Sequence, residues 1–479
     1  MKRTFRFYGC WLLTTLVVLL TSTLMPSTIL SQTATTIPSR HVIICVDGVG
    51  VSTINKMRAE GHFKMFHTPS HMISTFPSLT NAALSKILEP AGAGMTGGYE
   101  DNFFDTESNR MRGGILDRFR SDHFIRGTFR ELFDYHPSAI KSGLGYATPP
   151  LSTYLESLSD LIRLRQKAKS NNKPVFLAYT GATDSLAHVG GETLLRSFLT
   201  RLDDTLADIV RDSKTPVTVT MFSDHGNDFR KYRRVGLKEP LREAGFKFEN
   251  KITDDKSVVL PQFGLVGSGV LFTRDKNEER LANVLATLEG VDFVTYERRG
   301  IVYVANRLGE ATIEKRGDEY RYLPTKGDPL ELLSIMHNAN GRNGGDGFIK
   351  DEEWFEWTSA SARPDVVSRI FEGATRGVLN RANVIVNLED GYYTGSSFLD
   401  VFTILQATHG NIGQEQSYGF AMSTVAELPT YIRAGDLWKT LGSAQLERSV
   451  KLRSNGNGSH HGQPESRVAG RGEPGPSQM

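Results

Sequence analysis

Short apolar runs that end on polar loop residues alternate along this chain with segments whose apolar residues recur every three or four positions. The apolar runs lie at 41–48, 173–181, 216–226 and 383–391. Their continuous apolar character predicts buried parallel strands, and the spacing in the intervening segments predicts amphipathic helices. We therefore expect an α/β fold of three layers, in which helices cover both faces of a mostly parallel central sheet.

Acidic and imidazole side chains follow several of the predicted strands. The set comprises Asp47, Asp184, His188, Asp224, His225 and, much later, His409. Ligands of parallel sheets bind beyond the carboxyl ends of the strands, where such residues meet. Asp184 and His188 are four residues apart, so on one helical turn they share a face and form half of a metal site. Carboxylate and imidazole ligands suit Zn²⁺ best, with Mn²⁺ as the nearest competitor.

Each of these residues also has an ordinary structural explanation. An aspartate at a strand end is a common turn residue, an Asp–His pair at this spacing can be a surface ion pair, and a lone histidine can be structural. What favours a site is the order of the whole set along one chain.

The segment 73–88 predicts a strand that turns into a helix near Pro77. In one interpretation, Ser78 and Thr80 simply cap the open N–H groups of this helix. In the other, a hydroxyl at the turn is a nucleophile, because a helix N-terminus stabilises an alkoxide and attracts phosphate. Thr75 is our candidate for this role, with Ser74 as its competitor.

Six short motifs fall in one order along the chain: VDG at 46–48, TFPS at 75–78, DNFFD at 101–105, DSLAH at 184–188, SDHG at 223–226 and THG at 408–410. In this order they resemble the alkaline phosphatase superfamily, and within it the nucleotide pyrophosphatase/phosphodiesterase branch. TFPS stands where that branch usually has TFPN. The resemblance is clear over roughly 41–230 and 383–440.

The resemblance implies an alkaline-phosphatase-like fold and a site with two zinc ions. One ion would be held by Asp184, His188 and His409. The other would be held by Asp47, Asp224 and His225, with the Thr75 oxygen completing it. The resemblance further implies that Thr75 forms a phospho-threonine intermediate and that Asn102 donates a hydrogen bond to a phosphoryl oxygen.

The expected function is therefore metal-dependent hydrolysis of phosphoric esters, of the type I phosphodiesterase/nucleotide pyrophosphatase kind, on a small-molecule ester or nucleotide. One alternative is a phosphomonoesterase on the same two-zinc site. Such enzymes use a nearby Lys and Arg, for which Arg163 and Arg165 are the closest candidates. A diesterase instead needs apolar or aromatic surface, which Phe103 and Phe104 offer. The other alternative is an exported binding domain without turnover.

The two ends of the chain predict export. Basic residues and the apolar run 11–25 are typical of a signal peptide spanning 1–34, with an uncleaved membrane anchor as the alternative. We expect a periplasmic or extracellular catalytic domain at 35–453, with an α+β insertion at about 230–380, and a disordered tail at 454–479. The net charge of +2 argues against a nucleic-acid polymer as partner. The oligomeric state stays open.

Overall fold

The computed structural model describes residues 40–113, 132–137, 149–262, 264–274, 276–339, 346–402 and 404–441. The chain divides into two compact units, Met1–Pro38 and Ser39–Met479, and the described residues all belong to the second. The predicted signal segment 1–34 and tail 454–479 lie outside the described residues. Within the described ranges, no helix combines the length and the apolar character that crossing a membrane requires.

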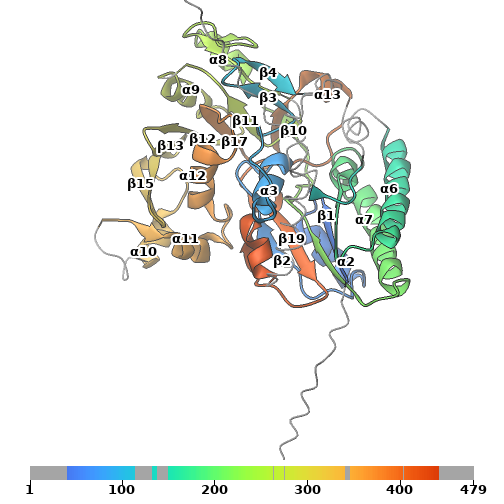
Figure 1. The fold of residues 1–479 in the computed structure, drawn as a ribbon. Helices are drawn as coiled ribbons and strands as arrows, with labels where there is room; N and C mark the ends of the chain where they lie inside the picture. The colour runs from blue at the N-terminus through green and yellow to red at the C-terminus, as the bar shows by residue number, and fades with distance from the viewer. Residues whose placement is uncertain are drawn as a thin grey trace, which may run out of the picture. The chain divides into compact units, whose positions relative to one another are not determined.

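A six-stranded mixed sheet combines four strands from the first half of the chain with two from its C-terminal part (Figure 1). Its order is β20 (Tyr431–Arg433), β2 (Ser70–Ile73), β19 (Tyr418–Ser423), β6 (Val217–Phe222), β1 (Arg40–Val46) and β5 (Val175–Thr180). The central strand β1 pairs in parallel with both β5 and β6. β19 alone runs in the opposite direction, since it is antiparallel to both β6 and β2, while β2 and β20 are parallel. Three of the four predicted strands therefore lie in this sheet.

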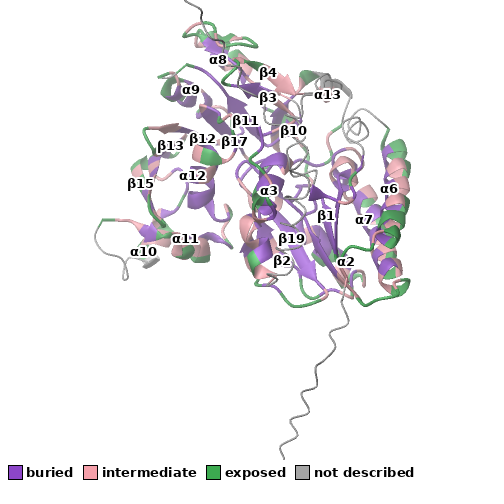
Figure 2. Cartoon of the chain, viewed as in Figure 1, coloured by how far each residue is buried: buried purple, intermediate pink, exposed green. Residues whose placement is uncertain are grey.

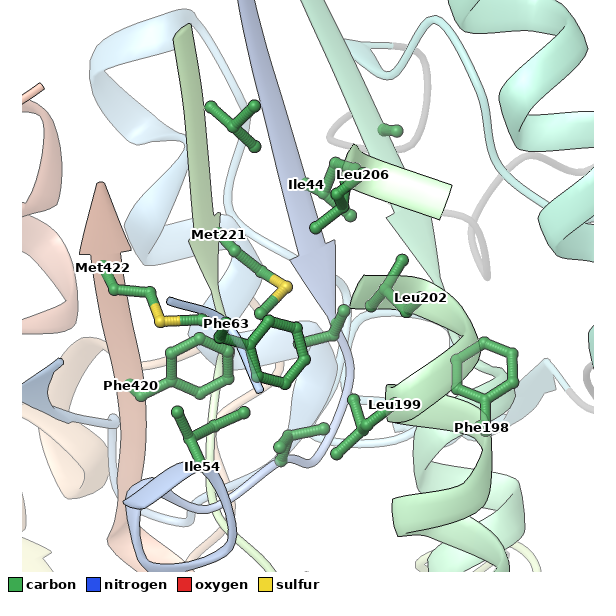
Figure 3. Packing of buried hydrophobic residues seen from close by; sticks show 14 of the residues in the cluster. Ile44, Ile54, Phe63, Phe198, Leu199, Leu202, Leu206, Met221, Phe420 and Met422 are labelled. Atoms are coloured by element: carbon green, nitrogen blue, oxygen red, sulfur yellow. The ribbon is translucent and has the colours of Figure 1, made fainter. Parts of the chain in front are cut away.

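Helices cover both faces of this sheet because successive side chains of a strand point to opposite sides. On one face of β1, Ile44 packs together with Val42 and Val46 against helices α2 (Val51–Ala59), α6 (Pro150–Ser170) and α7 (Ala182–Arg211). Figure 3 shows Ile44 among Leu202 and Leu206 of α7. Ile43 and Cys45 pack on the other side with α3 (Thr80–Ile87) and α15 (Leu437–Thr440). The uninterrupted apolar run of β1 thus reflects two covered faces.

A second sheet of seven strands is antiparallel throughout. Its order is β11 (Ser268–Leu271), β17 (Val384–Leu388), β12 (Val291–Arg298), β13 (Ile301–Asn306), β14 (Gly309–Arg316), β15 (Glu319–Gly327) and β16 (Ile349–Lys350). Helices α9 (Glu278–Leu285), α10 (Leu333–Ala339), α11 (Asp351–Thr358) and α12 (Val366–Arg376) belong to the same part of the chain. This sheet occupies much of the region predicted as an insertion.

The prediction that 383–391 forms a parallel strand of the central sheet is wrong. The run forms β17, which lies between β11 and β12 and is antiparallel to both. Val384, Val386 and Leu388 pack with α9 on one side, while Ile385 packs with α12 on the other. Both faces are buried, as in a parallel strand, so the apolar run gave no information on strand direction or on the choice of sheet.

Short elements connect the two sheets, and buried residues fill both (Figure 2). They include β3 (Asn102–Asp105) paired with β4 (Arg110–Gly113), and β10 (Leu265–Val266), β18 (Tyr392–Gly395) and β7 (Arg233–Arg234) in a three-stranded sheet. The remaining ones are α8 (Lys238–Glu243), β8 (Lys247–Phe248), β9 (Ser257–Val258), α13 (Ser397–Phe402), α14 (Gln414–Ser417), and 3-10 turns at Glu89–Ala91 and Ala434–Asp436.

Replacing Ile44 by alanine tests the packing of the central sheet. Ile44 lies on β1 and is fully buried against α7. We therefore expect Ile44→Ala to lower the free energy of unfolding by about 2–5 kcal/mol. Denaturant unfolding followed by circular dichroism measures the loss. Leu308→Ala is the control, because that side chain is 58% exposed and should change the stability by less than about 0.5 kcal/mol. Equal losses in the two variants would contradict this packing.

Candidate metal centre

The predicted site residues converge at the carboxyl ends of the central strands. Asp47 directly follows β1, and Asp224 comes two residues after the end of β6. β5 leads into α7, whose first turn carries Asp184. His409 arrives from the far end of the chain, where its neighbour Thr408 forms an antiparallel bridge with Asp228, just beyond β6. Parallel pairing of β1, β5 and β6 thus brings these segments to one edge.

Asp184, His188 and His409 form the first group that could hold a metal ion. Asp184 Oδ1 lies 3.2 Å from His188 Nε2 and 3.7 Å from His409 Nε2. Asp184 and His188 are on adjacent turns of α7, as their spacing predicts. This is the same set that the sequence assigns to one ion.

Asp47, Asp184 and His225 form a second such group. His225 Nε2 lies 3.5 Å from Asp47 Oδ1 and 3.4 Å from Asp224 Oδ2. The imidazoles of His225 and His409 stack with ring centroids 4.0 Å apart, so the two groups are contiguous. All six predicted ligand residues therefore lie together, and Asp184 contributes to both groups.

Each of the three imidazoles is oriented by a backbone carbonyl. Nδ1 donates to Ala407 O in His188 (2.7 Å), to Gly226 O in His225 (3.0 Å) and to Ser78 O in His409 (3.0 Å). A carbonyl oxygen only accepts, so Nδ1 carries a proton in each ring. Nε2 is the atom that faces the carboxylates in all three cases. Metal-ligating histidines are usually held in this way.

The carboxylates are oriented by neighbours on other elements. Asp47 Oδ2 accepts a short hydrogen bond from the Tyr179 hydroxyl of β5. Asp184 Oδ1 accepts one from Asn227 Nδ2 at 3.0 Å. Asp224 Oδ1 accepts one from the Gly48 N–H at 3.2 Å. Asp224 Oδ2 is buried and accepts no hydrogen bond from the described residues, which is a costly state for a carboxylate oxygen unless a cation neutralises it.

The pKa shifts within the cluster also favour a bound cation. Burial, and then the nearby Asp224 and Asp184, raise the pKa of Asp47 well above its ordinary value, and burial also raises the pKa of Asp224. Burial, and then the adjacent His225, lower the pKa of His409 to about 3. Burial acts to raise the pKa of Asp184, but the imidazoles of His188 and His409 outweigh it and hold that pKa below its usual range. Buried acids crowded against imidazoles fit divalent cations such as Zn²⁺ or Mn²⁺.

The two threonines of the strand-to-helix segment are placed differently from our expectation. Thr75 Oγ1 donates to Pro77 O at 3.3 Å, within its own turn. Thr80 Oγ1 instead lies 3.2 Å from Asp47 Oδ1 and 3.1 Å from His225 Nε2. The reason is the position of the helix: α3 begins at Thr80, three residues later than Pro77 led us to expect. The hydroxyl at the helix N-terminus is therefore that of Thr80.

Asn102 is the first residue of β3, next to the start of α3. Its neighbour Asp101 accepts a hydrogen bond from Asn81 Nδ2 at 3.2 Å, and Asn81 directly follows Thr80. This hydrogen bond ties the beginning of β3 to the beginning of α3. The role of Asn102 at a phosphoryl oxygen stays a prediction.

Sequence reasoning missed Thr80, Tyr179 and Asn227 as members of the site. In the sequence, Thr80 is interpreted as a helix cap. The same analysis favours a hydroxyl at the helix N-terminus as the nucleophile, so the correct helix start would have selected Thr80. Asn227 follows the SDHG motif directly, which was a usable signal. Tyr179 sits inside an apolar strand, and no local pattern distinguishes it from a packing residue.

The side chains proposed for substrate discrimination lie in other environments. Arg163 pairs with Asp160 and Glu156, and Arg165 pairs with carboxylates of α7 and its C-terminal end. Phe104 is buried against Phe272 in the core of the second sheet. The arginines are thus engaged in ion pairs on α6, and Phe104 has a packing role.

No family model matches this sequence, and no curated protein matches it. Among solved structures, human ectonucleotide pyrophosphatase/phosphodiesterase 5 matches with a TM-score of 0.47 and 10% identity over 86% of this chain and 95% of that one. The murine protein of the same name gives 0.45 and 10% over the same shares. Phosphonoacetate hydrolase from Sinorhizobium meliloti 1021, in complex with phosphonoformate, gives 0.46 and 11% over 87% and 95%. The first two names coincide with the branch that the sequence motifs resemble. At these TM-scores we draw no conclusion about activity from them.

Removing one imidazole should weaken metal binding. We expect His409→Ala to lower the affinity for Zn²⁺ by at least about tenfold, because His409 Nε2 faces Asp184 and His188 in the first group. Competition with a chromogenic chelator measures the affinity. His67→Ala is the matched control, since His67 is exposed and outside both groups. Unchanged affinity in His409→Ala, or an equal loss in the control, would contradict the assignment.

Proposed function

We propose that this chain is a metal-dependent hydrolase of phosphoric esters and that the hydroxyl of Thr80, rather than that of Thr75, is its nucleophile. The observation that carries the proposal is the position of Thr80 Oγ1 between Asp47 Oδ1 and His225 Nε2, at the first residue of α3. A hydroxyl cannot ionise alone at neutral pH and needs a base or a cation beside it. Thr80 has the candidate ligands of such a cation within hydrogen-bonding distance.

The residues divide into two ligand sets. Asp184, His188 and His409 would hold one divalent cation, and Asp47, Asp224 and His225 the other, with Zn²⁺ as the first choice and Mn²⁺ as the alternative. When bound, two such cations lower the pKa of a nearby hydroxyl and neutralise the charge that develops on the attacking and leaving oxygens. This chemistry is suited to in-line displacement at phosphorus.

The protein's own groups would orient the ester. Helix α3 begins directly after Leu79, whose side chain makes no capping hydrogen bond. The first backbone N–H groups of the helix can therefore donate hydrogen bonds to phosphoryl oxygens. Asn102, tied to this helix start through Asp101 and Asn81, is a further donor candidate. Thr80 Oγ1, oriented by its hydrogen bond to Asp47 Oδ1, would attack phosphorus and release its proton to solvent. The bond to the leaving oxygen breaks, and water then cleaves the phospho-threonine to restore the hydroxyl.

Diesters and nucleotide pyrophosphates are the substrate class that we favour. A monoester carries one more negative charge than a diester and needs an additional cation. Arg163 and Arg165 are engaged with carboxylates elsewhere. We further propose that the protein is exported, on the basic and apolar character of its first 25 residues.

The nucleophile is tested by Thr80→Ala. We expect a loss of kcat by at least about 10³-fold with the fold retained, because an activated nucleophile acts together with its neighbours and cannot be replaced by binding energy. Hydrolysis of an aryl phosphodiester by zinc-loaded protein measures the rate. Thr75→Ala is the matched control and should retain most of the activity.

The reverse pattern, with Thr75→Ala inactive and Thr80→Ala active, would return the assignment to Thr75. A wild-type protein that binds zinc tightly and hydrolyses no aryl phosphate ester would favour the exported binding domain instead.

The substrate class is tested by comparing an aryl phosphodiester with the matching monoester on one zinc-loaded preparation. We expect a higher kcat/KM for the diester, since Arg163 and Arg165, the arginines considered for the second charge of the monoester, are paired with carboxylates. A preference for the monoester of tenfold or more, about 1.4 kcal/mol in transition-state stabilisation, would identify a phosphomonoesterase on the same site.

A further inference from the structure

A buried arginine from the second sheet region reaches the segment that precedes the candidate nucleophile. Arg369 belongs to α12 and is only 5% exposed. Its Nη2 lies within hydrogen-bonding distance of three oxygens: Thr75 O at 2.9 Å, Ser78 Oγ at 3.0 Å and Ser417 Oγ at 2.9 Å. Its Nη1 donates to Pro364 O at 2.8 Å, next to α12 itself. One guanidinium thus connects α12 with the turn at 75–78.

This turn is in direct contact with the metal centre. The carbonyl of Ser78 accepts the Nδ1 hydrogen bond that orients His409. The N–H of Ser78 donates back to Gly410 O at 3.3 Å, and its hydroxyl donates to Asn411 O at 2.9 Å. Two residues after Ser78, the chain reaches Thr80 at the start of α3. The position of Ser78 therefore controls both a candidate metal ligand and the candidate nucleophile.

We propose that Arg369 is a positioning residue of this site, which sets the orientation of the His409 imidazole and of the Thr80 hydroxyl by holding the 75–78 turn. The inference rests on the proposed function for its effect on catalysis, but its effect on metal binding is independent of turnover. The guanidinium touches no ligand atom itself and acts through Thr75 O and Ser78.

The contacts of Arg369 are unusual for a structural arginine. The partly buried arginines near α12 are paired with carboxylates: Arg433 with Asp351 and Asp365, and Arg363 with Asp292 and Glu331. Arg369 is instead hydrogen-bonded to carbonyl and hydroxyl oxygens. Burial lowers its pKa to about 10, which still leaves it charged at neutral pH. The Asp365 carboxylate acts against this lowering. A buried charge that is hydrogen-bonded to oriented dipoles fixes those dipoles strongly, since releasing any of them leaves the charge less well solvated.

The test compares Arg369→Met and Arg369→Lys with Arg363→Met as the matched control. Arg363 is partly buried and also follows α11, but its carboxylate partners, Asp292 and Glu331, belong to neither of the two metal-binding groups. For each variant we would measure the Zn²⁺ affinity by chelator competition, the midpoint of thermal unfolding, and kcat and KM for an aryl phosphodiester.

We expect Arg369→Met to weaken Zn²⁺ binding by about 10–100-fold, as the loss of groups that orient ligands typically does, and to lower kcat more than it changes KM. Arg369→Lys should recover part of both, because an ammonium restores the charge but cannot span Pro364 O and Ser78 Oγ together. Arg363→Met should lose thermal stability and keep the Zn²⁺ affinity of the wild type.

Zinc affinity and kcat that stay unchanged in Arg369→Met and Arg369→Lys, with a loss of stability like that of Arg363→Met, would overturn the positioning role. If Arg369→Met does not fold, the Zn²⁺ affinity and kcat of Arg369→Lys decide whether Arg369 has the positioning role. If the wild type proves inactive, the proposed function fails, while the zinc affinities still decide the role of Arg369.

Discussion

The concentration of three carboxylates and three imidazoles in one buried place is the constraint on which the rest of this structure depends. Buried acids repel one another and lose their hydration, which is why the pKa values of Asp47 and Asp224 are raised. Asp224 Oδ2 has no hydrogen-bond donor among the described residues. A divalent cation relieves both costs at once, so the same arrangement that destabilises the cluster by itself makes it suited to metal binding.

The fold supports this cluster from several directions. Parallel pairing of β1 with β5 and β6 supplies Asp47, Tyr179 and the loop after β6, and α7 supplies Asp184 with His188. The C-terminal part of the chain closes the site with His409, whose ring is oriented by the carbonyl of Ser78. Through Arg369, the region of the second sheet also takes part, although its residues provide no candidate ligand in the two groups.

Much of this site could be read from the sequence, because strand ends and helical spacing are local properties. Asp47, Asp224 and the Asp184–His188 pair follow predicted strands, and they converge as parallel pairing requires. The strand at 383–391 was assigned to the wrong sheet, since burial on both faces is common to parallel and antiparallel strands. Thr80 was missed because Pro77 suggested an earlier helix start. The turn that delays this start is held by Arg369, 291 residues after Ser78, and no local pattern records such a contact.

The most direct test of the metal centre is anomalous X-ray diffraction from crystals of the zinc-soaked protein, measured at the zinc absorption edge. We predict two strong peaks. One should lie about 2.0–2.2 Å from Asp184, His188 and His409, and the other at the same distance from Asp47, Asp224 and His225, on the side of the Thr80 hydroxyl. Peaks confined to exposed side chains such as His67, with these six residues free of zinc, would contradict the account.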